Sequence, residues 1–330
     1  MNQRKKILVV GYGSMGRRRI RLVSELLYEV EFICVDSNLK RRMQAKKAGI
    51  EVYSNLEEGI KKKPDIAFVC TSPGHHAEII LRLIDAGINI FTELNLTSDK
   101  YDIISIEAKK KGVTVFVSST LLYKRQMEIF DRLVKTQKKP VTYIYHVGQY
   151  LPDWHPWENY KDFFAGKKST NGVREILAIQ IPWIIQTFGK IGSVNAIHQK
   201  CTELEIDFPD SIVMSIEHEN SNIGTFVADV VSRKATTRLE IINEDLYVSW
   251  GGHNEDLYLL NMKTKELEQV QIYESTEHVE GYSDNIEERP YREEIKAFFN
   301  VINGERARYT LEDDEYVLSL IDKIEGIKGN

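Results

Sequence analysis

KILVVGYGSMG, residues 6–16, joins an apolar stretch to three closely spaced glycines. Ile7 to Val10 predict a buried strand, and the residues after the last glycine predict a helix. Gly11, Gly13 and Gly16 stand at the G-x-G-x-x-G spacing, in the strand–turn–helix order that dinucleotide binding requires. In this motif the first glycine permits a tight turn, the second lets a pyrophosphate approach the backbone, and the third lets the helix pack close to the strand. The N–H groups at the start of the helix bind the phosphates, so this stretch predicts a dinucleotide site.

A carboxylate follows the next predicted strand, where the motif expects a group that binds the ribose. Residues 31–35 predict that strand, and Asp36 comes about 20 residues after the last glycine. A carboxylate there accepts hydrogen bonds from the adenosine 2′-hydroxyl and repels a 2′-phosphate, which favours NAD over NADP. Lys40, Arg41 and Arg42 leave an alternative open: one of them pairs with the phosphate of NADP, or all three lie on a solvated helix face.

The composition is that of a soluble globular protein. Of the 330 residues, 42% are hydrophobic and 28% are charged, and the length suffices for two domains with separate cores. The formal net charge is −5, and the chain has no basic stripe interleaved with aromatic residues, so nucleic acid is not an expected partner. No secretory signal and no apolar run of about 18 residues is present, so no membrane contact is expected.

The three cysteines are far apart and fall inside predicted strands. Cys34, Cys70 and Cys201 suit small buried side chains in a reducing compartment, which makes the cytoplasm the expected location. Their spacing does not match that of a zinc site, and no metal is expected.

The first third of the chain alternates predicted strands and helices, which argues for a parallel, doubly wound sheet with helices on both faces. Strands are expected at 5–10, 31–35, 66–71, 89–92 and 113–117, and helices at 14–28, 39–48, 56–61, 75–86 and 99–111. This segment predicts an α/β domain of the Rossmann type, residues 1–121.

The pattern changes near residue 120, where a helix is expected at 123–136. The apolar or alternating runs that follow favour one large, mostly antiparallel open sheet, and they cover 141–150, 193–204, 211–218, 223–232, 236–242, 245–250, 256–261 and 268–272. Helices at 290–303 and 311–325 close the chain. We therefore expect a second domain of α+β type, residues 122–330, and leave open whether its last helix packs back on the first.

Two loops at the carboxyl ends of predicted parallel strands carry further polar residues, at the edge where open α/β sheets bind ligands. One reads Thr71-Ser72-Pro73-Gly74-His75-His76-Ala77-Glu78 and the other Phe91-Thr92-Glu93. With the glycine fingerprint, its arginine-rich helix start and the change of pattern near residue 120, the whole chain resembles the glucose–fructose oxidoreductase and inositol dehydrogenase family, Gfo/Idh/MocA.

The resemblance implies a Rossmann domain, a second domain whose open sheet makes dimers or tetramers, and hydride transfer between NAD(P) and a carbohydrate, often a nucleotide-sugar. Carried over position by position, it places the cofactor contacts at Gly11, Tyr12, Gly13, Ser14, Met15, Gly16, Asp36, Thr71, Ser72, His76 and Glu93.

The chain departs from the family at the positions that carry proton transfer. The family's Glu-Lys-Pro segment corresponds to Glu93-Leu94-Asn95, so its lysine is replaced by Leu94. The family's Asp and His, four residues apart on a later helix, fall on Ile176 and Gln180, or on Glu175 and Ile179 after a shift of one residue. Neither alignment supplies both an acid and an imidazole.

Other residues are therefore the candidates for the proton transfer that an alcohol oxidation needs. We rank His155 and Glu175 as the catalytic candidates. The surrounding loop is rich in aromatic residues that stack on sugar rings and polar groups that bind hydroxyls. The expected substrate contacts are Asn95, Tyr150, Asp153, Trp154, Trp157 and Asn171.

We conclude from the sequence that the protein is an NAD-dependent oxidoreductase acting on a sugar or nucleotide-sugar. Two alternatives stay open: an NAD-binding protein without redox turnover, and a lyase or hydrolase that holds NAD tightly. The strands between 193 and 272 have no covering helices between them, which predicts a homodimer or homotetramer through the uncovered sheet face.

Overall fold

The computed structural model describes residues 5–27, 29–156, 158–273 and 287–326. The chain divides into two compact units. The first comprises Met1–Ser119 and Tyr291–Tyr316, and the second Thr120–Pro290 and Val317–Asn330. The division falls within the last two helices, α8 (Glu288–Ile302) and α9 (Leu311–Ile324).

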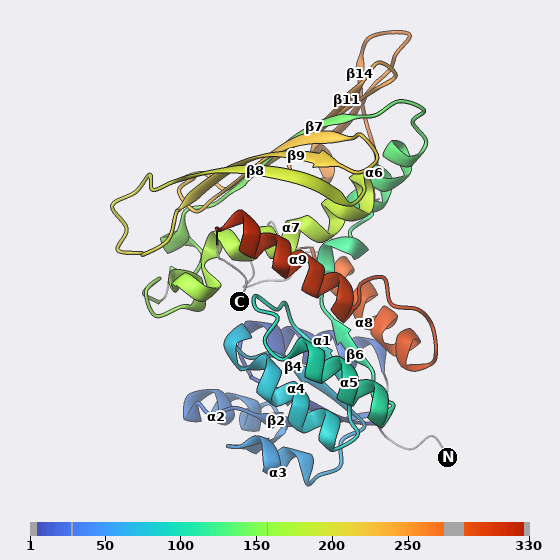
Figure 1. The fold of residues 1–330 in the computed structure, drawn as a ribbon. Coiled ribbons are helices and arrows are strands. Elements are labelled where there is room, and N and C mark those ends of the chain that lie inside the picture. The colour runs from blue at the N-terminus through green and yellow to red at the C-terminus, as the bar shows by residue number, and fades with distance from the viewer. Residues whose placement is uncertain (1–4, 28, 157, 274–286, 327–330) are drawn as a thin grey trace. The chain divides into compact units, whose positions relative to one another are not determined.

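The first unit contains a six-stranded parallel sheet with the order β3-β2-β1-β4-β5-β6 (Figure 1). This is the strand order of a doubly wound dinucleotide-binding domain, which confirms the predicted fold. The strands are β1 (Lys5–Val10), β2 (Val30–Val35), β3 (Glu51–Tyr53), β4 (Ile66–Val69), β5 (Asn89–Thr92) and β6 (Val115–Val117). The helices between them are α1 (Ser14–Leu26), α2 (Leu39–Lys47), α3 (Leu56–Ile60), α4 (His76–Asp85) and α5 (Tyr101–Lys111).

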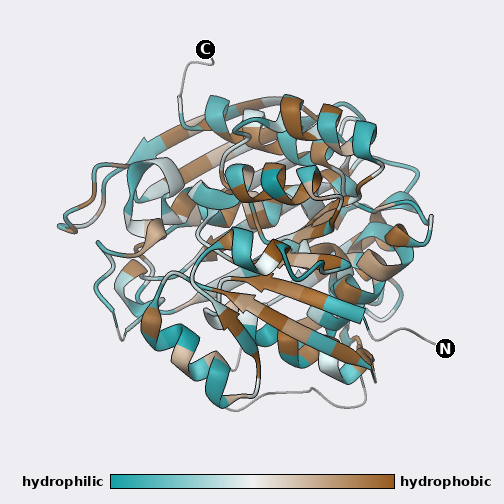
Figure 2. Ribbon diagram, turned by 90° about the horizontal axis from the view of Figure 1, so that it is seen from below, coloured by the Kyte–Doolittle hydropathy of each residue, from teal (hydrophilic) through white to brown (hydrophobic). Residues whose placement is uncertain are grey.

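The strands that the sequence predicts in the first unit are those whose side chains are mostly buried. All four residues of β4 and the last four of β1 are buried, as expected of parallel strands covered on both faces. Figure 2 shows strands that are mainly brown beside helices that carry both teal and brown bands. The edge strand β3 was not predicted, because it has only three residues, none of which is buried.

The second unit contains an eight-stranded sheet with the order β14-β13-β12-β11-β7-β10-β9-β8. Among the eight strands described, only the neighbours β7 and β10 are parallel, so the sheet is mostly antiparallel, as predicted. The strands are β7 (Thr142–Gly148), β8 (Ile191–Gln199), β9 (Ser211–His218), β10 (Ile223–Asp229), β11 (Thr236–Asn243), β12 (Leu246–Trp250), β13 (Leu257–Leu260) and β14 (Leu267–Gln269).

Two helices, α6 (Arg125–Lys135) and α7 (Gly172–Phe188), lie along one face of this sheet (Figure 1). The core between sheet and helices is aromatic: Tyr145 stacks on Phe226 at 5.1 Å between ring centroids and meets Trp183 edge-on at 5.2 Å. Most strand residues on the other face are partly or fully exposed. The most exposed apolar side chains there are Ile144, Ile197, Val213, Ile223 and Leu267.

The expectation for the cysteines is only partly correct. Cys34 is buried in β2, but Cys70 lies just beyond β4 and is partly exposed, and Cys201 lies beyond β8 and is exposed. The strand predicted to reach residue 204 ends at Gln199, because Lys200 and Asp210 organise a tight loop directly after it. Over the described part of the chain, no helix is both long and apolar enough to cross a membrane.

Candidate active site

The three glycines of the fingerprint differ in what surrounds them. Gly11 has φ +99°, and a Cβ atom there would stand 2.5 Å from the carbonyl oxygen of Cys70. A Cβ atom on Gly16 would stand 1.9 Å from the carbonyl oxygen of Gly11. At Gly13, by contrast, the backbone is extended, and the nearest atom to a Cβ would be Nη1 of Arg41 at 4.0 Å. The fold itself therefore demands Gly11 and Gly16, whereas the space at Gly13 is left for a ligand.

The helix that follows is suited to bind an anion in that space. Gly13 is the N-cap of α1, and within the described residues no side chain caps the helix and no acidic residue stands in its first turn. The first N–H groups of a helix lack partners within the helix and carry its positive dipole end. The loop therefore meets the geometric demands of a pyrophosphate site.

Asp36 lies at the end of β2, beside the glycine loop. Its Oδ2 accepts a hydrogen bond from the backbone N of Tyr12 at 2.7 Å, and its Oδ1 accepts one from the backbone N of Asn38 at 2.7 Å. Arg42 donates to the carbonyl oxygens of Asp36 and Ser37. These contacts fix the carboxylate of Asp36 next to the glycine loop. The sequence predicts a contact with the adenosine ribose at this carboxylate.

Arg41 occupies the position between the glycine loop and this carboxylate. Its Nη1 lies 3.9 Å from Oδ2 of Asp36, and half of its side chain is exposed. Of the three basic residues that the sequence left open, Arg41 is the one that faces both Gly13 and Asp36. Arg42 is instead bound to the backbone.

The two predicted loops after β4 and β5 meet at a buried histidine. His76 Nε2 lies 2.9 Å from the carbonyl oxygen of Thr71, and its Nδ1 lies 2.8 Å from Oδ1 of Asn95. Burial lowers the pKa of His76, while the hydrogen bonds with Asn95 and Thr71 raise it. The structure therefore brings together three of the predicted site residues, and it makes Asn95 a partner of His76.

Glu93 is held by a buried arginine that the sequence did not single out. Arg19 Nε donates to Oε1 of Glu93 at 2.6 Å, and its Nη2 donates to Oε2 of Glu93 at 3.2 Å and to Glu294 at 2.8 Å. The carboxylate of Glu93 is therefore engaged in an ion-pair network within the first unit. The sequence shows the arginine-rich helix start, but it does not show that Arg19 pairs with Glu294, which lies 275 residues further along the chain.

In the second unit, the side chains at the start of α7 have mostly structural partners. Asn171 caps the helix, since its Oδ1 accepts a hydrogen bond from the backbone N of Arg174 at 2.8 Å. Both hydrogens of its amide are engaged, by the carbonyl oxygen of Lys168 and by Glu325. Gln180, which one of the two alignments places at the family's histidine, accepts hydrogen bonds from Tyr145 and Trp183. Its amide oxygen is part of the core.

Glu175 has a different environment. Between Gly172 and Ile184, only Glu175 and Ile179 are not fully buried. The Oε2 atom of Glu175 is nevertheless inaccessible to solvent and has no hydrogen-bond partner among the described residues. Burial raises the pKa of Glu175 to about 8. A carboxyl group with this pKa changes protonation near neutral pH, as a general acid or base must.

His155, the other catalytic candidate, lies in the aromatic loop after β7. Its Nδ1 is 3.1 Å from Oε1 of Glu158, and its ring packs on Phe163 at 4.0 Å between centroids. Burial lowers the pKa of His155, while the charge of Glu158 raises it. A pKa below its ordinary value leaves the ring neutral at neutral pH and able to accept a proton.

The predicted substrate residues of this loop lie in several environments. Trp154 is partly buried and donates from Nε1 to the carbonyl oxygen of Gln149 at 3.3 Å. Tyr150 stacks under the guanidinium of Arg233 at 4.0 Å. Asp153 is exposed, and Trp157 lies outside the described residues.

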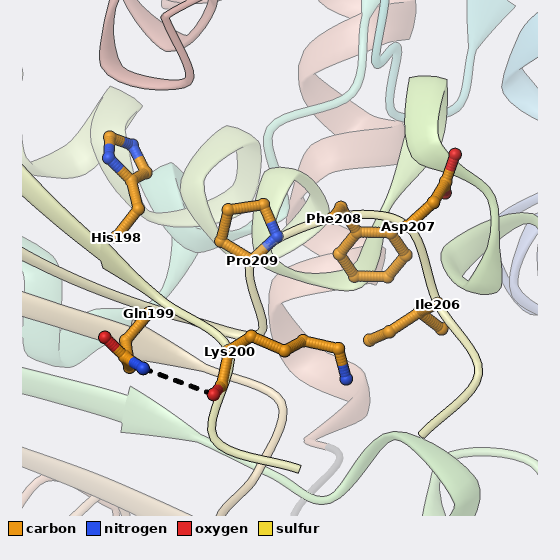
Figure 3. A pocket seen from close by; sticks show the side chains of 7 residues that line it. All are labelled: His198, Gln199, Lys200, Ile206, Asp207, Phe208 and Pro209. Atoms are coloured by element: carbon orange, nitrogen blue, oxygen red, sulfur yellow. Dashed lines mark hydrogen bonds between the residues drawn. The ribbon is translucent and has the colours of Figure 1, made fainter. Parts of the chain in front are cut away.

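A separate cavity of about 340 Å³ lies at the loop between β8 and β9 (Figure 3). It is lined by His198, Gln199, Lys200, Ile206, Asp207, Phe208 and Pro209, none of which the sequence singled out. The ammonium group of Lys200 is held by Thr202, Leu204 and the buried carboxylate of Asp210. The only ammonium group in the lining of this cavity is therefore already engaged by the loop itself. Across the residues that the structure describes, no group of three or more His, Cys, Asp or Glu side chains is arranged to hold a metal ion.

Comparison with known proteins agrees with this fold. Three solved structures share the fold over nearly the whole chain. GenD2 from gentamicin A biosynthesis, in complex with NAD, is 17% identical, with a TM-score of 0.79 and coverage of 99% of this chain and 95% of that chain. The WlbA dehydrogenase from Bordetella pertussis, in complex with NADH and UDP-GlcNAcA, is 13% identical, with a TM-score of 0.77 and coverage of 98% and 96%. UDP-N-acetylglucosamine 3-dehydrogenase GnnA from Acidithiobacillus ferrooxidans is 13% identical, with a TM-score of 0.75 and coverage of 98% and 97%.

No curated protein matches the sequence. Residues 5–119 match the family model GFO_IDH_MocA, described as the oxidoreductase family with an NAD-binding Rossmann fold. This match confirms the resemblance drawn from the motifs and the type of cofactor expected from them. The segment that matches this family model contains the glycine loop, Asp36, His76 and Glu93.

Proposed function

We propose that this protein is an NAD-dependent oxidoreductase that transfers a hydride between the nicotinamide and a hydroxyl-bearing carbon of a sugar or nucleotide-sugar. The observation that carries the proposal is the open space at Gly13, at the uncapped start of α1 and next to Asp36. GnnA and WlbA, which share the fold, support the substrate class, because one is a UDP-N-acetylglucosamine dehydrogenase and the other binds UDP-GlcNAcA.

The residues of the first unit would bind and orient the cofactor. The N–H groups of the loop from Gly11 to Gly16 would hold the pyrophosphate, and Asp36 the adenosine ribose. NAD, once bound, accepts the hydride. We expect NAD to be preferred over NADP, because a 2′-phosphate would meet the carboxylate of Asp36. Arg41 lessens this preference, since its guanidinium lies close to the carboxylate of Asp36 and to the space at Gly13, where it would attract a phosphate.

Thr71, Ser72 and His76 would lie along the cofactor in this proposal, as the family resemblance implies. Glu93 would act through Arg19 rather than by direct contact, because both of its oxygens are bound to that guanidinium. Asn171 is left out of the substrate contacts that we propose, since both hydrogens of its amide are engaged. Tyr150, Asp153, Trp154 and Trp157 remain predictions.

Proton transfer requires a group other than the family's lysine, because Leu94 stands in its place. Glu175 is our first candidate: its carboxyl group is unpartnered at Oε2 and its pKa is raised to about 8. At pH 7 this group is mostly protonated, so it would donate a proton to an alkoxide when a ketone is reduced. Above pH 8 it would accept the hydroxyl proton when an alcohol is oxidised. His155 is the second candidate, because its neutral ring is able to accept a proton.

A second candidate function is an NAD-binding protein without turnover. The observation that favours it is the core position of Ile176 and Gln180, which replaces the family's acid and imidazole by packing groups. A lyase or hydrolase with tightly held NAD is a third candidate. Incubation with NAD and a panel of sugars and UDP-sugars separates the three. Accumulation of reduced nicotinamide supports the oxidoreductase, product without net reduction supports the third candidate, and bound NAD with neither supports the second.

We also propose that the protein is a cytoplasmic homodimer or homotetramer. The helices of the second unit lie along one face of the sheet, and the other face presents five large apolar side chains that are each more than 40% exposed. Burying such a patch against a second copy is favourable, because apolar surface contributes about 25 cal/mol per Å² removed from water.

A further inference from the structure

Three charged residues of the second unit stand at helix ends that do not suit their charge. Arg174 lies in the first turn of α7, at the positive end of that helix dipole, and it is buried. Asp322 lies in the last turn of α9, and Glu325 follows directly after it, at the negative end of that dipole. A cation is unfavourable at the start of a helix and an anion at its end. Each of these charges therefore needs a partner outside its own helix.

The three groups are one another's partners. Arg174 donates from Nη2 to Oδ1 of Asp322 at 2.6 Å, and from Nη1 to Oε2 of Glu325. The other oxygen of Glu325, Oε1, accepts a hydrogen bond from the amide of Asn171 at 2.7 Å. The side chains of Arg174 and Glu325 are only 4% and 12% exposed, so loss of one would leave the charge of the other largely out of water. This ion-pair network holds the end of α9 to the start of α7.

Asn171 connects the ion-pair network to the backbone of Glu175. Its Oδ1 accepts a hydrogen bond from the backbone N of Arg174 at 2.8 Å, and its carbonyl oxygen accepts one from the backbone N of Glu175 at 2.9 Å. These two bonds fix the first turn of α7, from which the side chain of Glu175 projects. Neighbouring helix positions point roughly 100° apart, so Arg174 and Glu175 do not face each other. The network therefore reaches Glu175 through the backbone.

We propose that Glu325 is a positioning residue for Glu175. It holds Asn171 and Arg174 at once, and the first turn of α7 that they form keeps the carboxyl group of Glu175 away from water. Asp322 is the lesser partner, because its side chain is 34% exposed. The inference rests on the proposed function only for the role of Glu175 in proton transfer.

A positioning role and a direct effect of charge predict different shifts at Glu175. Burial is the cause that raises the pKa of Glu175 to about 8. If the charges of the network acted directly, loss of the cation Arg174 would raise this pKa and loss of the anion Glu325 would lower it. If they act by position, either loss loosens the first turn, admits water to the carboxyl group and lowers the pKa. The direction of the shift in Arg174→Met therefore separates the two.

Carbon-13 NMR of the glutamate carboxyl groups measures this titration in the protein alone, without cofactor or substrate. The Glu175 signal is assigned by its loss in Glu175→Gln. We expect its midpoint near pH 8 in the native protein. In both Glu325→Ala and Arg174→Met it should fall by at least about one pH unit, a tenfold loss of proton affinity. The double variant should shift it no further than the larger single effect, because one network is lost. Lys323→Met removes an exposed charge from the same turn of α9 and is the matched control, with no shift expected.

Asp322→Asn is a milder change that decides the question if the other two variants do not fold. It should lower the midpoint in the same direction and speed hydrogen exchange at the backbone N–H of Glu175. A higher midpoint in Arg174→Met, or an unchanged midpoint in folded Glu325→Ala and Asp322→Asn, would overturn the proposal. So would a native midpoint at the ordinary value for a glutamate. Absence of turnover, with the midpoints shifted as expected, would instead contradict the proposed function and support the positioning role.

Discussion

Replacing Gly13 by valine should weaken NAD binding by roughly 100-fold or more and leave the fold intact. The backbone at Gly13 has φ −74° and ψ −164°, which any residue adopts, and a Cβ atom there would meet nothing closer than 4.0 Å. We therefore expect the free energy of unfolding to change by less than about 1 kcal/mol. A valine side chain would fill the space assigned to the pyrophosphate. Losing two charge-assisted hydrogen bonds there, each about 1.5 kcal/mol, raises the Kd for NAD by roughly 100-fold or more.

Isothermal titration with NAD and thermal unfolding measure the two effects separately. Gly16→Ala should instead lower the stability of the first unit, because its Cβ atom would stand 1.9 Å from the carbonyl oxygen of Gly11. Gly192→Val is the matched control: Gly192 is exposed on β8, and the nearest atom to its Cβ would be 3.5 Å away. Native NAD affinity in a folded Gly13→Val protein would refute the reasoning.

Three further predictions follow from the site and from the sheet. In competitive titrations NAD should bind more tightly than NADP. Asp36→Asn should narrow this difference in affinity, and Arg41→Ala should weaken the binding of NADP more than that of NAD. Tighter binding of NADP by the native protein would contradict this. Glu175→Gln should lower turnover by about 10²–10⁴-fold and remove an inflection near pH 8, above which sugar oxidation is fastest in the native protein. Because the pKa of Glu175 is raised in the folded state, the protein loses stability as the pH rises from the ordinary pKa of a glutamate toward pH 8. Glu175→Gln should therefore also raise the melting temperature at pH 8 and not at pH 4. If His155→Ala instead removes the inflection, His155 is the base. Val213→Lys on the outer sheet face should break up the homodimer or homotetramer that we propose, and light scattering should record a lower mass. A native protein that is already monomeric would exclude this interface.

The sequence predicts the elements that carry strong local signals. The four-residue apolar run before Gly11 and the glycine spacing suffice for β1, the turn and α1, because each step depends on neighbouring residues. Alternating runs predict the strands of the second sheet, and their order follows only from the structure. Short edge strands such as β3 escape detection, since three half-exposed residues give no period.

The parts of the site that the sequence misses are those made by long-range polar contacts. Arg19 pairs with Glu93 and Glu294, and Arg174 meets Asp322 from 148 residues away. Buried charges with partners so distant in sequence look like ordinary surface residues in the chain. Asn171 shows the converse case: an Asn before a helix is a common N-cap, and its position next to Gly172 was a signal for that structural role.

Hydride transfer itself is tested most directly with a UDP-sugar that carries deuterium on its ring carbons. After incubation with the protein and NAD, the cofactor is separated and its nicotinamide ring is analysed by mass spectrometry. Our account predicts deuterium in the nicotinamide ring, and much less of it with Gly13→Val at the same NAD concentration. Cofactor that binds to the native protein but carries no deuterium, for every sugar in the panel, would contradict it.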